Sequence, residues 1–85
     1  MAQGMGRTLN VSEGGILLET HISIDPKNAI ALSIGLEDEL INIKGKVVFS
    51  APGKDEKFEA GIEFLEMPDS TLNILKKFIK VFSEQ

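Results

Sequence analysis

Three residues near the N-terminus have the types and spacing of a binding motif: Asn10, Ser12 and Gly15 form the pattern N-x-S-x-x-G. The Asn10 amide can donate and accept hydrogen bonds, and so can the Ser12 hydroxyl. Gly14 and Gly15 let the backbone come close to a ligand and expose its N–H groups. This combination predicts a site for an anionic ligand.

The cation nearest to this motif is Arg7, whose planar fork suits phosphate oxygens better than a lysine does. Arg7 is also the only arginine in the 85 residues, so one copy of the chain cannot build a site that needs two guanidinium groups. The candidate ligand-binding residues are Arg7, Asn10, Ser12, Gly14 and Gly15.

Simpler structural roles compete with this interpretation. Asn10 and Ser12 can merely shape a turn before the next strand, and Arg7 can be a solvated terminal side chain. His21 has no second ligand nearby, which favours a structural or surface role. The acidic run 37–39 fits a hydrated turn better than a cation site, because EF-hand spacing is absent. No nucleophile–base or paired-carboxylate arrangement stands out, so we expect neither catalytic nor metal-binding residues.

The composition narrows the class of protein. A chain of this length forms one small domain. Its net charge of −4 argues against non-specific nucleic-acid binding, and the lack of cysteine excludes disulfides and thiolate metal sites. No apolar run approaches the length of a membrane span, and residues 1–6 show no signal pattern. We expect a cytoplasmic protein in which residues 1–6 are disordered or left over from cloning.

Between Ile16 and Leu65, apolar residues alternate with polar or small ones, which predicts strands with one buried face. In the third of these strands Phe49 is expected to share the buried face with Val47, and Gly45 suggests a bulge or a sharp bend. The predicted strands lie near 16–20, 29–36, 41–49 and 58–64, and turn signals separate them at 25–28, 37–39 and 52–55.

After Leu65 the period changes to that of an amphipathic helix. Asp69 or Ser70 is expected to be its N-cap. An apolar stripe about 120° wide is expected to pack across the sheet; it comprises Leu72, Leu75, Phe78, Ile79 and Phe82. The predicted fold is therefore mainly β, an antiparallel barrel or curled sheet of about five strands with one C-terminal helix.

These elements together resemble a PilZ domain over residues 6–82. The N-x-S-x-x-G motif continues into Gly14-Gly15-Ile16-Leu17-Leu18, a long hairpin follows, and Gly61-Ile62-Glu63-Phe64 precedes the helix. The resemblance implies a PilZ-like domain over residues 7–83 with a six-stranded barrel-like fold. It also implies a regulatory rather than catalytic role, because PilZ domains are bacterial receptors for the second messenger cyclic di-GMP.

Family binding sites have two parts, and this chain matches one of them. Asn10, Ser12 and Gly15 match the strand motif, whereas an N-terminal R-x-x-x-R segment cannot be written with Arg7 alone. The first strand of the family also lacks a counterpart; either the natural protein lacks it or the chain is truncated. We expect this chain to bind cyclic di-GMP weakly or not at all, and we expect no other cofactor.

Three roles remain open at this stage. The first is a module that responds to cyclic di-GMP, with a cation from Arg7 or a second chain. The second is an adaptor that has lost the ligand and contacts another protein, and an exposed sheet edge would also allow a homodimer. The third, a nucleic-acid-binding barrel of the OB type, lacks the basic groove and stacking aromatics that it needs. We expect no membrane insertion.

Overall fold

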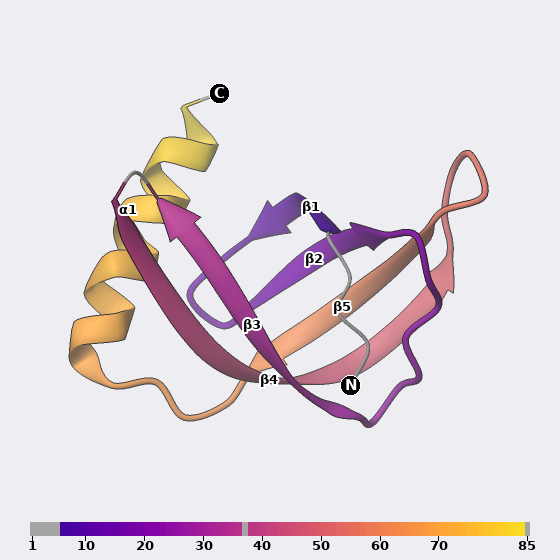
Figure 1. Ribbon diagram of the computed structural model, residues 1–85, viewed down its shortest axis with the longest axis horizontal. Coiled ribbons are helices and arrows are strands. Elements are labelled where there is room, and N and C mark those ends of the chain that lie inside the picture. Colours follow the sequence, from indigo (N-terminus) through magenta and orange to yellow (C-terminus); the bar gives the residue numbers. More distant parts are fainter. Residues whose placement is uncertain (1–5, 37, 85) are drawn as a thin grey trace.

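The computed structural model describes residues 6–36 and 38–84, in which five strands precede one helix. The elements are β1 (Gly6–Val11), β2 (Gly15–Thr20), β3 (Ala29–Leu36), β4 (Glu39–Pro52), β5 (Phe58–Phe64) and α1 (Asp69–Ser83). Neighbouring strands are antiparallel, in the order β1-β2-β5-β4-β3. The sheet curls, and the helix lies beside one end of it (Figure 1). The predicted mainly β, curled antiparallel sheet with a C-terminal helix is confirmed.

The N-terminal boundary differs slightly from the expected one. β1 begins at Gly6, so the last residue of the segment 1–6 already belongs to the sheet. Residues 1–5 lie outside the described residues, and the prediction that they are disordered or left over from cloning is untested.

One face of the sheet carries the core, as the alternating pattern predicts. The buried residues of this face are Val11, Ile16, Ile41, Ile43, Val47, Ile62 and Phe64, and Leu75 joins them from the helix. Their neighbours in sequence point to the opposite face, because side chains alternate along a strand. We call this opposite side the outer face.

The prediction that Phe49 shares the buried face with Val47 is wrong. The β4–β5 register shifts between these two residues, which leaves Val48 as an extra residue. Such a bulge reverses the alternation beyond it, and Phe49 is accordingly 42% exposed. Of the two features expected at Gly45, a bulge is excluded there, because the register is regular at Gly45 and shifts at Val48. Gly45 is required for close packing instead, because a Cβ there would lie 2.5 Å from Ile62 Cγ2.

Turns lie near the predicted positions, but β4 takes in Glu39 and Pro52 and is therefore longer at both ends than the predicted strand 41–49. In the turn before β3, Lys27 has a φ of 75° and its N–H donates to the Val47 carbonyl. The β4–β5 hairpin closes through the Gly53 N–H to the Lys57 carbonyl, with positive φ at Asp55 and Glu56. Between β3 and β4, Glu37 lies outside the described residues.

The helix begins one residue earlier than a side-chain cap would place it. Pro68 is the N-cap, so neither Asp69 nor Ser70 caps the helix, and no side chain makes a cap hydrogen bond. Pro68 suits the N-cap position because the helix requires no N–H from this residue, and the fixed φ of proline is compatible with the start of a helix. Asp69 instead lies in the first turn, where its carboxylate interacts favourably with the helix dipole.

The apolar stripe of α1 packs mainly against β4 at the end of the sheet rather than across its whole width. Leu75 is fully buried, and the rings of Phe78 and Phe82 stack 6.4 Å apart. In the described part of the chain, no helix is long and apolar enough to cross a membrane.

Candidate functional site

A bulge in β1 brings two of the predicted site residues to one face. Arg7 lies opposite Glu19 and Asn10 lies opposite Leu17, but the register between them shifts at Leu9. Without this extra residue, Arg7 and Asn10 would point to opposite faces, since they are three positions apart. The bulge places both side chains on the outer face.

The bulges in β1 and β4 adjoin the same row of residues across the sheet, one on each side of it. Leu17 lies opposite Asn10 on one side and Gly61 on the other, and Gly61 in turn lies opposite Phe49. We call these four residues, Asn10, Leu17, Gly61 and Phe49, the Leu17–Gly61 row. Because a bulge bends and twists its strand, two bulges at the ends of one row bend the sheet around that row.

A hollow of about 330 Å³ opens over this row. Its lining residues are Asn10, Val11, Ser12, Gly14, Gly15, Ile16, Leu17, Val48, Gly61, Ile62 and Glu63. A Cβ at Gly61 would lie 2.6 Å from Phe49 Cδ1, so Gly61 is required for the packing of the Phe49 ring beside the hollow. Four of the five predicted site residues line the hollow, and Arg7 is the exception.

The polar groups of the motif are only partly engaged by the chain itself. Asn10 Oδ1 accepts a hydrogen bond from the Val11 N–H at 2.9 Å, which leaves the amide donors of Asn10 for another partner. Ser12 Oγ lies 3.5 Å from the Gly15 carbonyl oxygen, at the limit of a hydrogen bond. The Asn10 amide and the Ser12 hydroxyl therefore remain available to a ligand.

The same segment also forms a tight turn, as the simpler interpretation expects. The Ser12 N–H donates to the Gly15 carbonyl, and the Gly14 carbonyl accepts from the Phe64 N–H, both at 2.9 Å. These bonds join the β1–β2 hairpin to β5. The turn is compatible with a ligand site, because it engages the backbone and largely spares the side chains.

The two glycines have different reasons to be glycine. A Cβ at Gly15 would lie 2.5 Å from the Ile62 carbonyl oxygen, whereas a Cβ at Gly14 meets nothing within 4 Å. Neither has positive φ. Gly15 therefore serves the close packing of β2 on β5, and only Gly14 leaves open space beside the hollow.

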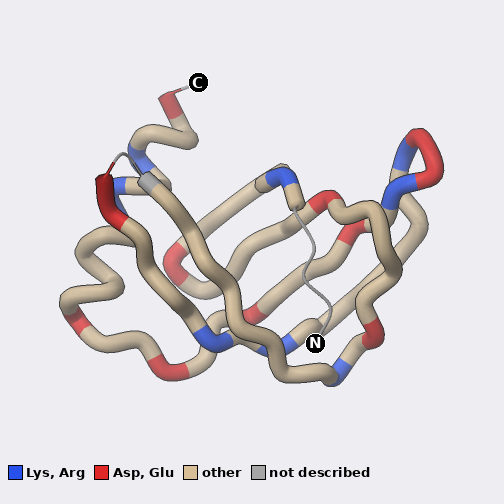
Figure 2. Tube along the Cα trace, in the orientation of Figure 1, with Lys and Arg blue, Asp and Glu red and all other residues tan. Residues whose placement is uncertain are grey.

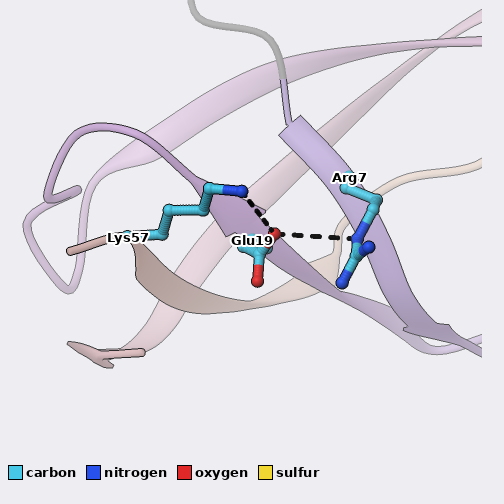
Figure 3. Close-up of polar contacts among 3 residues, drawn as sticks. All are labelled: Arg7, Glu19 and Lys57. Atoms are coloured by element: carbon cyan, nitrogen blue, oxygen red, sulfur yellow. Dashed lines mark ion pairs between the residues drawn. The ribbon is translucent and has the colours of Figure 1, made fainter. Parts of the chain in front are cut away.

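Arg7 lies on the outer face but in an ion pair outside the hollow. Its Nε lies 3.6 Å from Glu19 Oε1, and Lys57 Nζ lies 3.6 Å from the same oxygen (Figure 3). The Glu19 side chain is only 13% exposed, whereas that of Arg7 is 73% exposed. Arg7 of β1 and Lys57, which lies just before β5, thus neutralise one largely covered carboxylate.

The hollow itself is not cationic. Among its lining residues the only ionisable side chain is that of Glu63, which is exposed. Figure 2 shows the basic residues of the described chain distributed over several elements rather than gathered at one place. The site offers hydrogen-bonding groups and backbone to a ligand but no positive charge from its own lining.

Besides three core residues, Val11, Ile16 and Ile62, the prediction missed four residues of the outer face, namely Leu17, Val48, Gly61 and Glu63. These residues come from β2, β4 and β5, and only the cross-strand register brings them next to Asn10. Gly61 and Glu63 had a sequence signal, since both lie in the segment Gly61-Ile62-Glu63-Phe64 that carries the family resemblance. Val48 had none, because its exposure depends on the bulge.

Comparison with protein families identifies one that covers most of the chain. The family model described as PilZ domain matches residues 2–80. Comparisons with curated proteins and with solved structures give no significant match. The matched range includes the β1–β2 hairpin, all five strands and most of the helix. PilZ is a family of regulatory and ligand-binding domains, and this chain belongs to it.

Proposed function

We propose that this PilZ domain is a regulatory module in which the hollow is the half of a cyclic di-GMP site that lacks cations. By itself the chain binds the dinucleotide weakly or not at all. The observation that supports this proposal is the separation of the motif: Asn10, Ser12, Gly14 and Gly15 line one hollow, while Arg7 lies outside it in an ion pair. Because cyclic di-GMP is a bacterial messenger, we place the domain in the bacterial cytoplasm.

Electrostatics argue for weak binding. Cyclic di-GMP carries two phosphates, and the lining of the hollow contributes the carboxylate of Glu63 and no cation. Loss of one partner of a buried, charged hydrogen bond costs about 2–5 kcal/mol. Two missing guanidinium groups would therefore weaken binding by several orders of magnitude, since 1.4 kcal/mol is about tenfold.

Arg7 is the one cation that could partly compensate. Its ion pair with Glu19 is exposed on the Arg7 side, and such pairs contribute only about 0–1 kcal/mol. Lys57 would still neutralise Glu19 if Arg7 moved away. A bound phosphate could thus draw Arg7 from its pair at small cost.

An NMR titration with cyclic di-GMP tests the location of the site as well as the affinity. At millimolar ligand we expect the amide signals of Asn10, Ser12 and Gly61 to shift, with weak affinity. Asn10→Ala should remove these shifts because it removes the amide donors of the hollow. Asn73→Ala, the same substitution on the exposed side of α1, is the matched control and should leave them unchanged.

Two results would contradict the proposal. Submicromolar affinity of this chain for the dinucleotide would show that the arginine pair is unnecessary. Shifts confined to residues away from the hollow would show that the motif is not the site.

A second function, that of a protein-binding adaptor, is favoured by apolar side chains beside the hollow. Val48 is 54% exposed and Phe49 42% exposed, and the two are adjacent on the outer face. A polar ligand does not need them. If the titration produces no shifts at all, the adaptor function becomes the better explanation of this face.

A further inference from the structure

The edge strand β3 has an unusually simple side-chain pattern. Every residue at its outer face is small and uncharged, namely Ala29, Ala31, Ser33 and Gly35. The residues between them are large and aliphatic, namely Ile30, Leu32 and Ile34. Figure 2 shows that β3 carries neither acidic nor basic residues. Natural sheets usually protect an edge with charge, proline or a bulge, and β3 has none of these over 29–35.

The pattern is symmetric about Leu32. In both directions from Leu32 the order is a small residue, an isoleucine and a small residue. A strand with this symmetry can pair with a second copy of itself in antiparallel orientation. Leu32 then lies opposite Leu32 of the second copy, and Ile30 lies opposite Ile34. The faces also match. In this register even-numbered residues lie opposite even-numbered ones, so the core side of one copy continues into the core side of the other.

Within the described residues, the edge of β3 that faces away from β4 is free to accept such a strand. In the sheet order β3 is a terminal strand, and within residues 6–36 and 38–84 only β4 pairs with it. Its regular register with β4 runs without a shift from Ala29 to Leu36. A straight, regular edge presents unpaired N–H and C=O groups in the order that another strand requires.

The core is incompletely closed along this edge. Ile30, Leu32 and Ile34 pack against the core but are only half-buried, although they lie on the core side. Pairing would bring the same three side chains of a second copy beside them. Apolar area that one copy leaves in water would then be covered.

Residues 29–35 carry no charge that opposes the pairing, and the nearest charges on the adjacent strand are those of two lysines. Lys44 and Lys46 lie on β4, opposite Ala31 and Ala29. In the paired arrangement the two β4 strands are separated by three strand spacings, or roughly 14 Å. This distance exceeds the Debye length of about 8 Å at physiological ionic strength, so repulsion between these lysines is largely screened.

We propose that β3 is a self-association edge, and that two copies of this chain pair antiparallel through residues 29–35 about a two-fold axis at Leu32. The two curled sheets thereby become one continuous sheet. This interface involves neither the hollow nor β1, so it goes beyond the proposed ligand site and is independent of it.

Sedimentation of the native chain from about 1 µM to 1 mM should show a reversible monomer–dimer equilibrium. Amide exchange should show that protection of β3 increases with protein concentration. A monomer over the whole range overturns the proposal. Protection of β3 that does not depend on concentration also overturns it, because another part of the same chain would then cover the edge.

A matched pair of variants tests the side-chain contacts. Ala31 and Ser33 lie on the outer face and oppose each other across the proposed axis, so Ala31→Glu with Ser33→Glu places like charges face to face. Ala31→Glu with Ser33→Lys places opposite charges there. We expect at least tenfold weaker association for the first and association close to native for the second. Equal association of the two variants overturns the proposal; circular dichroism checks that both are folded.

Cross-linking tests the register. The chain has no native cysteine, so only the introduced cysteines can form a disulfide. Ala31→Cys and Ser33→Cys chains are mixed in equal amounts and oxidised. The proposed register places these residues directly opposite each other, within disulfide reach, whereas two Ala31→Cys chains meet only diagonally at about 7–8 Å. We expect the mixed disulfide to exceed either homodimer severalfold above the statistical yield. A statistical mixture overturns the two-fold register at Leu32.

Discussion

The two edges of this sheet are built differently. β1 is six residues long, contains a bulge at Leu9 and carries Arg7 in an ion pair. β3 is eight residues long, regular along its whole pairing with β4, and uncharged. Both edges contribute aliphatic residues to the core side, but Val11 of β1 is buried whereas Leu32 of β3 is half-buried.

This difference shows how one feature can serve two purposes. The bulge at Leu9 brings Arg7 and Asn10 to the same face, and it also interrupts the row of backbone groups that another strand would need. The irregular edge thus suits a ligand site and resists strand pairing. The regular edge offers no polar side chain beyond Ser33 and suits pairing.

The largest expected effect is a difference in the free energy of unfolding between substitutions at the closed end of the core and substitutions at the β3 edge. Leu75→Ala should lower the free energy of unfolding by about 2–5 kcal/mol, because Leu75 is fully buried. Leu32→Ala should lower it by roughly half as much in the monomer, because part of that side chain is already in water. Urea denaturation at low micromolar protein measures both. Equal losses would mean that the core is as closed under β3 as under the helix.

The next effect concerns how closely β2 packs against β5. Gly15→Ala should cost about 1–3 kcal/mol, because the new Cβ would approach the Ile62 carbonyl and push β2 from β5. Gly14→Ala should change stability by less than about 0.5 kcal/mol, since its Cβ enters open space. Thermal unfolding of this pair checks the prediction. A large loss for Gly14→Ala would contradict the geometry of the turn.

A smaller effect tests the ion pair beside the ligand motif. Glu19→Gln should free Arg7 and Lys57 and strengthen cyclic di-GMP binding by up to about fivefold, the equivalent of about 1 kcal/mol. Glu59→Gln is the matched control. Glu59 lies opposite Glu19 on β5, and its substitution removes the same charge. NMR titration compares the two. The same gain in both variants would indicate a general charge effect rather than release of Arg7.

The smallest expected effect is that of Arg7→Ala on self-association. If charge alone kept β1 from pairing, this variant would associate more strongly than the native chain. We expect no change in sedimentation and a stability change below about 0.5 kcal/mol, because the bulge remains and the lost pair is exposed. New dimers in this variant would show that Arg7, not the bulge, protects the edge.

Much of the architecture followed from local pattern. The period-two alternation predicted β2, β3 and β5 and their buried faces, and the change of period predicted α1. Each of these predictions depends only on neighbours along the chain. The N-cap of α1 was misplaced by one or two residues, because Pro68 takes that position without a side-chain bond.

The errors in β4 have a different origin. Gly45 looked like a bulge and Phe49 looked like a core residue, yet the bulge lies at Val48 and turns Phe49 outward. A bulge is a relation between two strands, so one strand's own sequence does not locate it. The same holds for Gly15. Glycine is required there because a Cβ would lie too close to the carbonyl oxygen of Ile62 on β5.

The amino-acid sequence by itself determined the kinds of element, the motif of Asn10, Ser12 and Gly15, and the shortage of arginine, because these are properties of residue type and spacing. Only the tertiary structure decided that Asn10 shares a hollow with Val48 and Gly61, that Arg7 is paired away from it, and that β3 is a free edge within the described residues. The physical reason is the pairing register. Inter-strand hydrogen bonds, and the bulges that interrupt them, set which distant residues become neighbours and on which face they meet.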